Sequence, residues 1–251
     1  MRFLNPLSKY FILTVALSFM SLPIYSLSFT QSVKKAALNK NVWIPSASAL
    51  LFAITGQDGE ISDWASKNKP IFGNIKNAKN YSDAVAFYYL PAANLISKGV
   101  SHYQNKHNPN LLVHYTSFLL APAVTYFMNR VIKDRTGRIR PDSSNDLSFP
   151  SAHASLSSSL NEEFNYHSRI LYEGDSYNGI YYFNEALVGS VAWARMEAKK
   201  HHLTDVLVGY SLGKFFSHFF HYYLFNKDDQ VKLSFDYRPG GFSSGKFSWR
   251  F

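Results

Sequence analysis

Residues 133–141 of this chain read Lys-Asp-Arg-Thr-Gly-Arg-Ile-Arg-Pro, and residues 150–153 read Pro-Ser-Ala-His. Residues 194–205 read Ala-Arg-Met-Glu-Ala-Lys-Lys-His-His-Leu-Thr-Asp. Taken singly, each stretch has an ordinary structural explanation: charges at a helix end, the start of a helix, and a His–Asp pair one helical turn apart. Taken together, they supply cations, imidazoles and a carboxylate in a fixed order along the chain. This combination predicts one composite site, built from three separate parts of the sequence.

The cations of this site are Lys133, Arg140 and Arg195. Three positive charges suit a phosphoryl dianion and the charge that grows as it transfers. The planar guanidinium group of arginine also binds phosphate oxygens in a bidentate manner. Because Pro141 disfavours helical geometry at Arg140, we expect the chain to leave its helix near Asp134 and to bring Arg140 back towards Lys133.

The second stretch predicts an anion-binding helix start. Pro150 is suited to the first turn of a helix. That turn would leave the amides of Ser151, Ala152 and His153 without acceptors inside the helix, directed towards a bound anion. The hydroxyl group of Ser151 could add one more donor.

The third stretch provides a candidate nucleophile. A neutral imidazole at His201 can attack phosphorus without a metal. Asp205, one helical turn further on, could hold the other ring nitrogen and stabilise the cation that forms. His153 is then free to act as general acid on the leaving oxygen and as general base on water.

These residues resemble the three-part motif of the type 2 phosphatidic acid phosphatase superfamily, Lys-x6-Arg-Pro, Pro-Ser-Gly-His and Ser-Arg-x5-His-x3-Asp. That superfamily includes bacterial acid phosphatases, lipid phosphatases and vanadium haloperoxidases. The resemblance implies that His201 becomes transiently phosphorylated, that His153 protonates the leaving alcohol, and that neither a metal nor a cofactor is required. It also implies that the phosphate is held by Lys133, Arg140, Ser151, the Ala152 amide and Arg195.

The sequence departs from the motif at two positions. Ala152 replaces glycine, which keeps the amide but crowds the approach to the backbone, and Ala194 replaces serine, which removes a hydroxyl group. Neither change removes a charged or proton-transferring group. His202 is a second candidate nucleophile, but the five-residue spacing after Arg195 selects His201.

Hydrophobic periodicity predicts an all-α fold of six helices with a short C-terminal β-hairpin. The resemblance implies that the helices form a six-helix bundle of the phosphatidic acid phosphatase type 2/haloperoxidase kind. The expected helices cover residues 39–55, 82–98, 108–133, 150 onward, 181–196 and 203–225, with a polar turn at 57–59 and a loop or short helices at 66–80. The expected domains are a signal peptide or N-terminal anchor at 1–28, a helical phosphatase domain at 29–225 and the hairpin tail at 226–251.

Composition excludes several classes of protein. Charged residues make up only 17% and aromatic residues also 17%, so the chain should collapse rather than remain disordered. The absence of cysteine excludes disulfides, thiolate zinc sites and cysteine nucleophiles. The net charge of +9 is compatible with anionic partners, including phosphate and membrane lipid.

The N-terminus predicts export. Arg2 and Lys9 form a basic region before an apolar run, Tyr10 to Met20, that is short for a membrane span and typical of a signal peptide. We therefore expect a periplasmic protein, or alternatively an integral or peripheral membrane protein with its site facing outside the cytoplasm.

The sequence thus predicts a metal-independent phosphomonoesterase that acts on a lipid phosphate or a small phosphomonoester. Three alternatives stay open: a phosphotransferase to an acceptor alcohol, a vanadate-dependent haloperoxidase, and an inactive relative that binds anionic lipid. The expected partners are the phosphate-ester or phospholipid substrate and a possible membrane surface, with no nucleic acid. The oligomeric state stays open.

Overall fold

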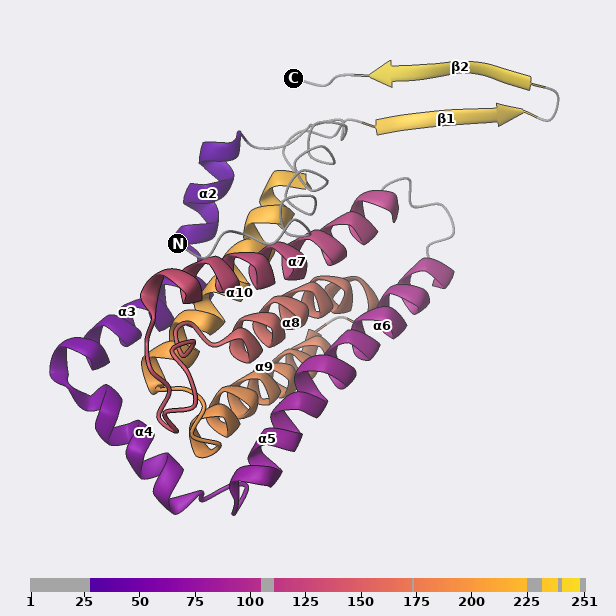
Figure 1. Ribbon diagram of the computed structural model, residues 1–251. Coiled ribbons are helices and arrows are strands. Elements are labelled where there is room, and N and C mark those ends of the chain that lie inside the picture. The colour runs from indigo at the N-terminus through magenta and orange to yellow at the C-terminus, as the bar shows by residue number, and fades with distance from the viewer. Residues whose placement is uncertain (1–27, 105–110, 173, 225–231, 239–240, 249–251) are drawn as a thin grey trace.

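The computed structural model describes residues 28–104, 111–172, 174–224, 232–238 and 241–248 (Figure 1). A π-helical segment, η1 (Val85–Tyr89), joins two of the helices without a break. The α helices are α2 (Phe29–Ala37), α3 (Lys40–Thr55), α4 (Gln57–Asn68), α5 (Ile75–Ala84), α6 (Leu90–Gln104), α7 (Leu111–Thr136), α8 (Ala152–Leu171), α9 (Gly174–Glu197) and α10 (Leu203–Leu224). Strands β1 (Lys232–Arg238) and β2 (Gly241–Ser248) pair with each other in antiparallel orientation.

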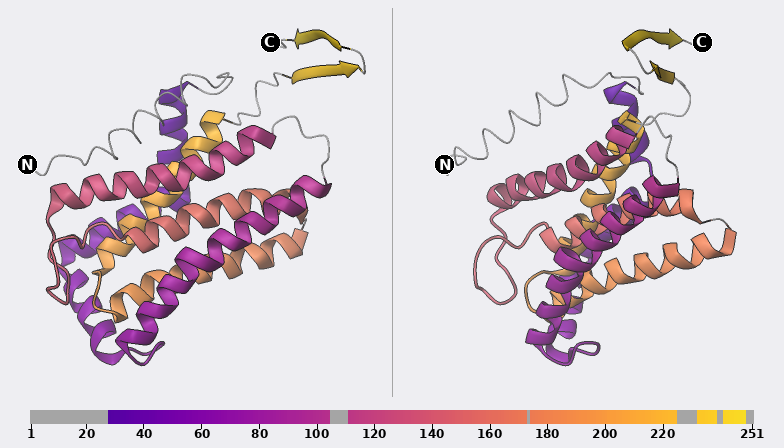
Figure 2. Two further views of the ribbon diagram at one scale, coloured as in Figure 1. Left: turned by 45° about the vertical axis from the view of Figure 1, so that its right-hand side comes forward. Right: turned by 90° about the vertical axis from the view of Figure 1, so that its right-hand side faces the viewer.

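Helix α8 is the central element of the bundle, and it packs against α6, α7, α9 and α10 (Figures 1 and 2). Its contact with α10 is unusually close because two glycines of α10 face it. A Cβ atom on Gly209 would lie 2.6 Å from the carbonyl oxygen of Ser151, and one on Gly213 would lie 2.1 Å from that of Ser155. Only glycine allows this approach, which fixes the start of α10 against the start of α8.

The interior of the bundle is partly ionic. Lys214 on α10 is fully buried, and its Nζ donates to Glu162 on α8 at 2.9 Å and to Glu185 on α9 at 2.5 Å. These carboxylates raise the pKa of Lys214 in spite of its burial, which acts in the opposite direction. A main apolar cluster, made of Val85, Leu90, Phe118, Leu160, Val188 and Val191, completes the packing around α8.

The structure contains more helices than the six predicted, even though only part of the chain is described. Helix α2 was not expected, and α4 begins where a polar turn had been predicted, because Gly56 (φ 76°) reverses the chain and the next helix starts at once. The buried face of α4 consists of Asp58, Ser62, Ala65 and Ser66. Such a small and polar face gives no apolar periodicity, so the sequence pattern missed it.

The boundaries of two predicted helices also shift. Helix α9 begins at Gly174 instead of residue 181. Helix α8 begins at Ala152 with Ser151 as its N-cap, so Pro150 lies before the helix instead of opening it. This shift affects the candidate site, because it determines which backbone amides at the start of α8 have no acceptor inside the helix.

The predicted targeting segment, residues 1–28, lies outside the described residues except for Ser28, which caps α2. Within the ranges given above, every helix is too short or too polar to cross a lipid bilayer.

Candidate active site

The predicted site residues gather at one end of the bundle, where α7 and α9 end and α8 and α10 begin (Figures 1 and 2). Direct hydrogen bonds join these residues to one another and to the loop between α7 and α8. The amide of Ser151 donates to the carbonyl oxygen of Asp205 at 2.9 Å, and Nζ of Lys133 donates to the carbonyl oxygen of Leu147 at 2.7 Å. The long loop between α7 and α8 therefore forms part of the site.

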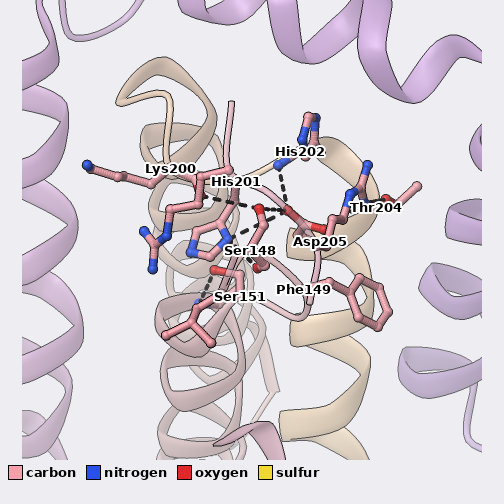
Figure 3. Close-up of polar contacts among 12 residues, drawn as sticks. Ser148, Phe149, Ser151, Lys200, His201, His202, Thr204 and Asp205 are labelled. Carbon is pink, nitrogen blue, oxygen red and sulfur yellow. Dashed lines mark hydrogen bonds and ion pairs between the residues drawn. The ribbon is translucent and has the colours of Figure 1, made fainter. Parts of the chain in front are cut away.

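His201 is held as a neutral imidazole with a defined tautomer. Its Nδ1 lies 2.7 Å from the carbonyl oxygen of Ser148 (Figure 3). A carbonyl oxygen can only accept, so Nδ1 carries the proton and Nε2 keeps a free lone pair. The residue is only 1% exposed, and burial, assisted by the charges of Lys133 and Arg195, lowers its pKa to about 3.

Asp205 lies beside His201 but does not occupy the predicted position. Its Oδ2 is 3.7 Å from Nδ1 of His201, beyond hydrogen-bonding distance, because that N–H donates to the carbonyl oxygen of Ser148 instead. The carboxylate accepts instead from the Ser148 hydroxyl at 2.5 Å, the His202 amide at 2.8 Å and Arg138 at 2.7 Å (Figure 3).

These donors keep Asp205 ionised. Burial alone would raise the pKa of Asp205, but the adjoining His201 ring, the Ser148 hydroxyl and the Arg138 guanidinium lower it to about 2. A fixed negative charge therefore lies within ion-pair distance of the His201 ring, where it can stabilise a positive charge that develops there.

Lys133, Arg140 and Arg195 form a cluster of like charges. Burial and the charges of Arg140 and Arg195 lower the pKa of Lys133 to about 7. Burial likewise lowers the pKa of Arg195 to about 10, and its buried Nε atom has no acceptor among the described residues. Arg140 donates through Nε to Asn145 at 2.8 Å. An anion placed among these groups would relieve their mutual repulsion.

The start of α8 leaves two free amides instead of the three predicted. The Ser151 amide donates to the carbonyl oxygen of Asp205, and the Ser151 hydroxyl, as the N-cap, accepts from the Ala154 amide at 3.4 Å. The amides of Ala152 and His153 have no acceptor in the described part of the chain. They are the first two amides of a long helix, and amides in this position bind anions.

His153 contacts a residue that the motif does not contain. Its Nε2 lies 2.7 Å from Oδ1 of Asp83 on α5, and the same carboxylate oxygen is 3.6 Å from Arg195. Burial and then the charge of Arg195 lower the pKa of His153 to about 4. The charge of Arg195 lowers the pKa of both His153 and His201.

Sequence reasoning also missed the contacts that hold the start of α10 in place. Arg138 bridges Asp205 and Asp58, with its NH2 atom 2.5 Å from the Asp58 carboxylate. Asp58 in turn accepts from the amide of Thr204 at 2.8 Å. Asp58 lies 80 residues from Arg138 in sequence, so no local pattern indicates the contact. Figure 3 shows the ring of His202 on the far side of Asp205 from the ring of His201.

The fold of this helical bundle is similar to that of a PAP2-type phosphatase of known structure. The crystal structure of a transmembrane PAP2-type phosphatidylglycerolphosphate phosphatase from Bacillus subtilis is similar, with a TM-score of 0.55 and 22% sequence identity. The similarity covers 70% of this chain and 88% of that one. No family model and no curated protein matches the sequence.

Proposed function

We propose that this chain is a phosphatase that hydrolyses phosphate monoesters through a phosphohistidine at His201. The observation that carries the proposal is the hydrogen bond from Nδ1 of His201 to the Ser148 carbonyl oxygen. It leaves the Nε2 lone pair available for attack in a ring that burial keeps neutral. The shared PAP2 fold is consistent with this chemistry.

The proposed first step is attack of His201 Nε2 on phosphorus. Lys133, Arg140 and Arg195, with the free amides at the start of α8, hold the phosphate oxygens. As the N–P bond forms, the P–O bond to the alcohol breaks, and protonated His153 gives its proton to the leaving oxygen. The positive charge on the phosphorylated ring is stabilised by Asp205.

The proposed second step is hydrolysis of the phosphohistidine. His153, now neutral, takes a proton from a water molecule as the oxygen of that water attacks phosphorus. The N–P bond breaks, its electron pair returns to Nε2 of His201, and inorganic phosphate leaves. Both protonation states are restored without a metal, because side chains provide the positive charge.

An apolar alcohol is the favoured leaving group. The ring of Phe87 lies 4.8 Å from that of His153, and Phe87 is 47% exposed. Tyr88, Leu95 and Ile96, further along η1 and α6, are also exposed apolar side chains. These side chains follow Phe87 along the segment that contacts the proposed general acid, and they favour a lipid phosphate over a small polar ester as the substrate. The similar protein from Bacillus subtilis is a phosphatidylglycerolphosphate phosphatase.

We also propose that residues 29–225 form the catalytic unit, that residues 1–28 direct export, and that residues 226–251 form a tail. Export would place the site outside the cytoplasm, at or near a membrane surface.

A phosphate-release screen tests the proposal. Purified protein should release phosphate from phosphatidic acid or p-nitrophenyl phosphate, and His201→Ala should abolish release. His202→Ala is the matched control, because its ring neighbours the site but has no assigned role, and it should keep most of the activity. Activity that survives His201→Ala would contradict the proposal.

A further inference from the structure

Asp83 makes the polar contact that fixes the ring of His153. The residue lies on α5 just before the π-helical segment η1, and its Oδ1 is 2.7 Å from Nε2 of His153. Phe87, four residues later, meets the same ring edge-on, with an interplanar angle of 74°. One short segment therefore contacts both a nitrogen and the ring of His153. Irregular π-helical turns often occur at functional sites.

The same segment also contacts a phosphate-binding cation. Oδ1 of Asp83 is 3.6 Å from NH1 of Arg195, and that nitrogen donates to the Ser82 hydroxyl at 3.1 Å. Two consecutive residues of α5 thus contact His153 and Arg195, which lie on different helices.

The charges around His153 oppose each other. Burial and the charges of Arg195 and Arg140 lower the pKa of His153, whereas the hydrogen bond and the charge of Asp83 raise it. A general acid must carry a proton when the substrate is bound. The carboxylate of Asp83 favours the protonated ring, and so would the negative charge of a bound phosphate.

We propose that Asp83 is a positioning residue that orients His153 and favours the protonated ring, from which a proton passes to the leaving oxygen. This inference rests on the proposed phosphatase function. Because Asp83 engages Nε2, the proton that is transferred comes from Nδ1. The Nδ1–H bond breaks, and the proton joins the alcohol oxygen as the P–O bond breaks. His153 is then neutral, and its remaining N–H, at Nε2, donates a hydrogen bond to the carboxylate of Asp83.

The experiment compares two leaving groups in the Asp83→Asn variant. p-Nitrophenolate leaves with little help from an acid, whereas the alkoxide of hexyl phosphate needs a proton. We expect kcat/KM for hexyl phosphate to fall about 100-fold, within the range of general acid catalysis, and kcat/KM for p-nitrophenyl phosphate to fall less than about fivefold. The matched control is Asp63→Asn, an exposed carboxylate on α4 paired with Lys67, and it should change neither rate.

A second variant separates a positioning role from a structural one. Asp83→Glu keeps the carboxylate, so its kcat/KM for hexyl phosphate should be at least about tenfold higher than that of Asp83→Asn. The alkaline limb of the hexyl phosphate pH profile should also move to lower pH in Asp83→Asn, because the general acid loses its proton earlier.

The outcomes distinguish the two proposals. A wild-type protein that releases phosphate from neither substrate would overturn the phosphatase function itself. An active wild type with equal losses on both substrates in Asp83→Asn, with no loss on either, or with no recovery in Asp83→Glu would overturn the role of Asp83 alone.

Discussion

Nδ1 of His201 lies 2.7 Å from the carbonyl oxygen of Ser148, while the carboxylate of Asp205 is 3.7 Å from the same nitrogen. The tautomer of the proposed nucleophile is therefore set by the main chain of the loop between α7 and α8. The carboxylate orders that loop, because it binds the hydroxyl group of the same serine. Asp205 acts on His201 both through charge and through Ser148.

Replacing Asp205 should change acid stability. The pKa of Asp205 is lowered to about 2 in the folded protein, from an ordinary value of 3.8. A lowered folded-state pKa contributes stability that is present above pH ~4 and is lost as the pH falls towards ~2. The wild type should lose on the order of 2 kcal/mol across this window from Asp205 alone. Denaturant unfolding at several pH values should show a smaller loss in Asp205→Asn, and an identical loss in both proteins would contradict the assignment.

Anion binding should depend on the protonation of Lys133. With its pKa near 7, Lys133 is charged below neutral pH and loses its charge above it. Inhibition by tungstate, a dianion across this range, should weaken as the pH rises through about 7. Lys133→Arg, whose charge does not titrate, should make the inhibition constant nearly independent of pH. A wild-type constant that is already flat would contradict this role.

The close contact between α8 and α10 should be sensitive to a single methyl group. A Cβ at position 213 would lie 2.0 Å from the Ser158 hydroxyl and 2.1 Å from the Ser155 carbonyl oxygen. Gly213→Ala should therefore destabilise the fold by about 2 kcal/mol or more. It should also reduce activity, because α10 carries the proposed catalytic residue Asp205 close to its start.

Gly189→Ala on α9 is the control for this contact. A Cβ at position 189 meets nothing within 4 Å, and alanine favours a helix over glycine. Its melting temperature should stay equal or rise slightly. Equal melting temperatures for the two variants would show that the helices do not approach as described.

Chelation should leave phosphate release unchanged. The proposal gives the neutralisation of phosphate charge to the cations Lys133, Arg140 and Arg195. Activity measured after dialysis against EDTA should match that of untreated protein, whereas a loss restored by an added divalent cation would contradict metal independence.

Sequence patterns indicated which residues come together at the candidate site, but they did not indicate the contacts around those residues. The candidate site residues belong to short motifs with a recognisable spacing, and in the structure they lie at one end of the bundle. They are Lys133, Arg140, His153, His201 and Asp205. The loop carbonyl that holds His201 could not be predicted, because main-chain acceptors leave no trace in residue identity.

The contacts made by Asp58 and Asp83 were missed for a different reason. Both are single carboxylates on helices far from the motif in sequence, and they meet Arg138 and His153 only after the bundle has packed. Helix α4 was missed because its buried face is polar and small. Sequence patterns reveal apolar stripes and closely spaced motifs. The contacts of Asp58 and Asp83 and the polar face of α4 show neither kind of pattern.

The most direct test of phosphohistidine chemistry is to trap the intermediate in His153→Ala with p-nitrophenyl phosphate. This leaving group departs without an acid, but hydrolysis of the intermediate lacks its base, so phosphorylated protein should accumulate. Peptide fragmentation after an alkaline quench should then find one phosphate on His201 and none on His202. A protein that turns over substrate with no phosphate on His201, or with phosphate on another residue, would contradict the mechanism.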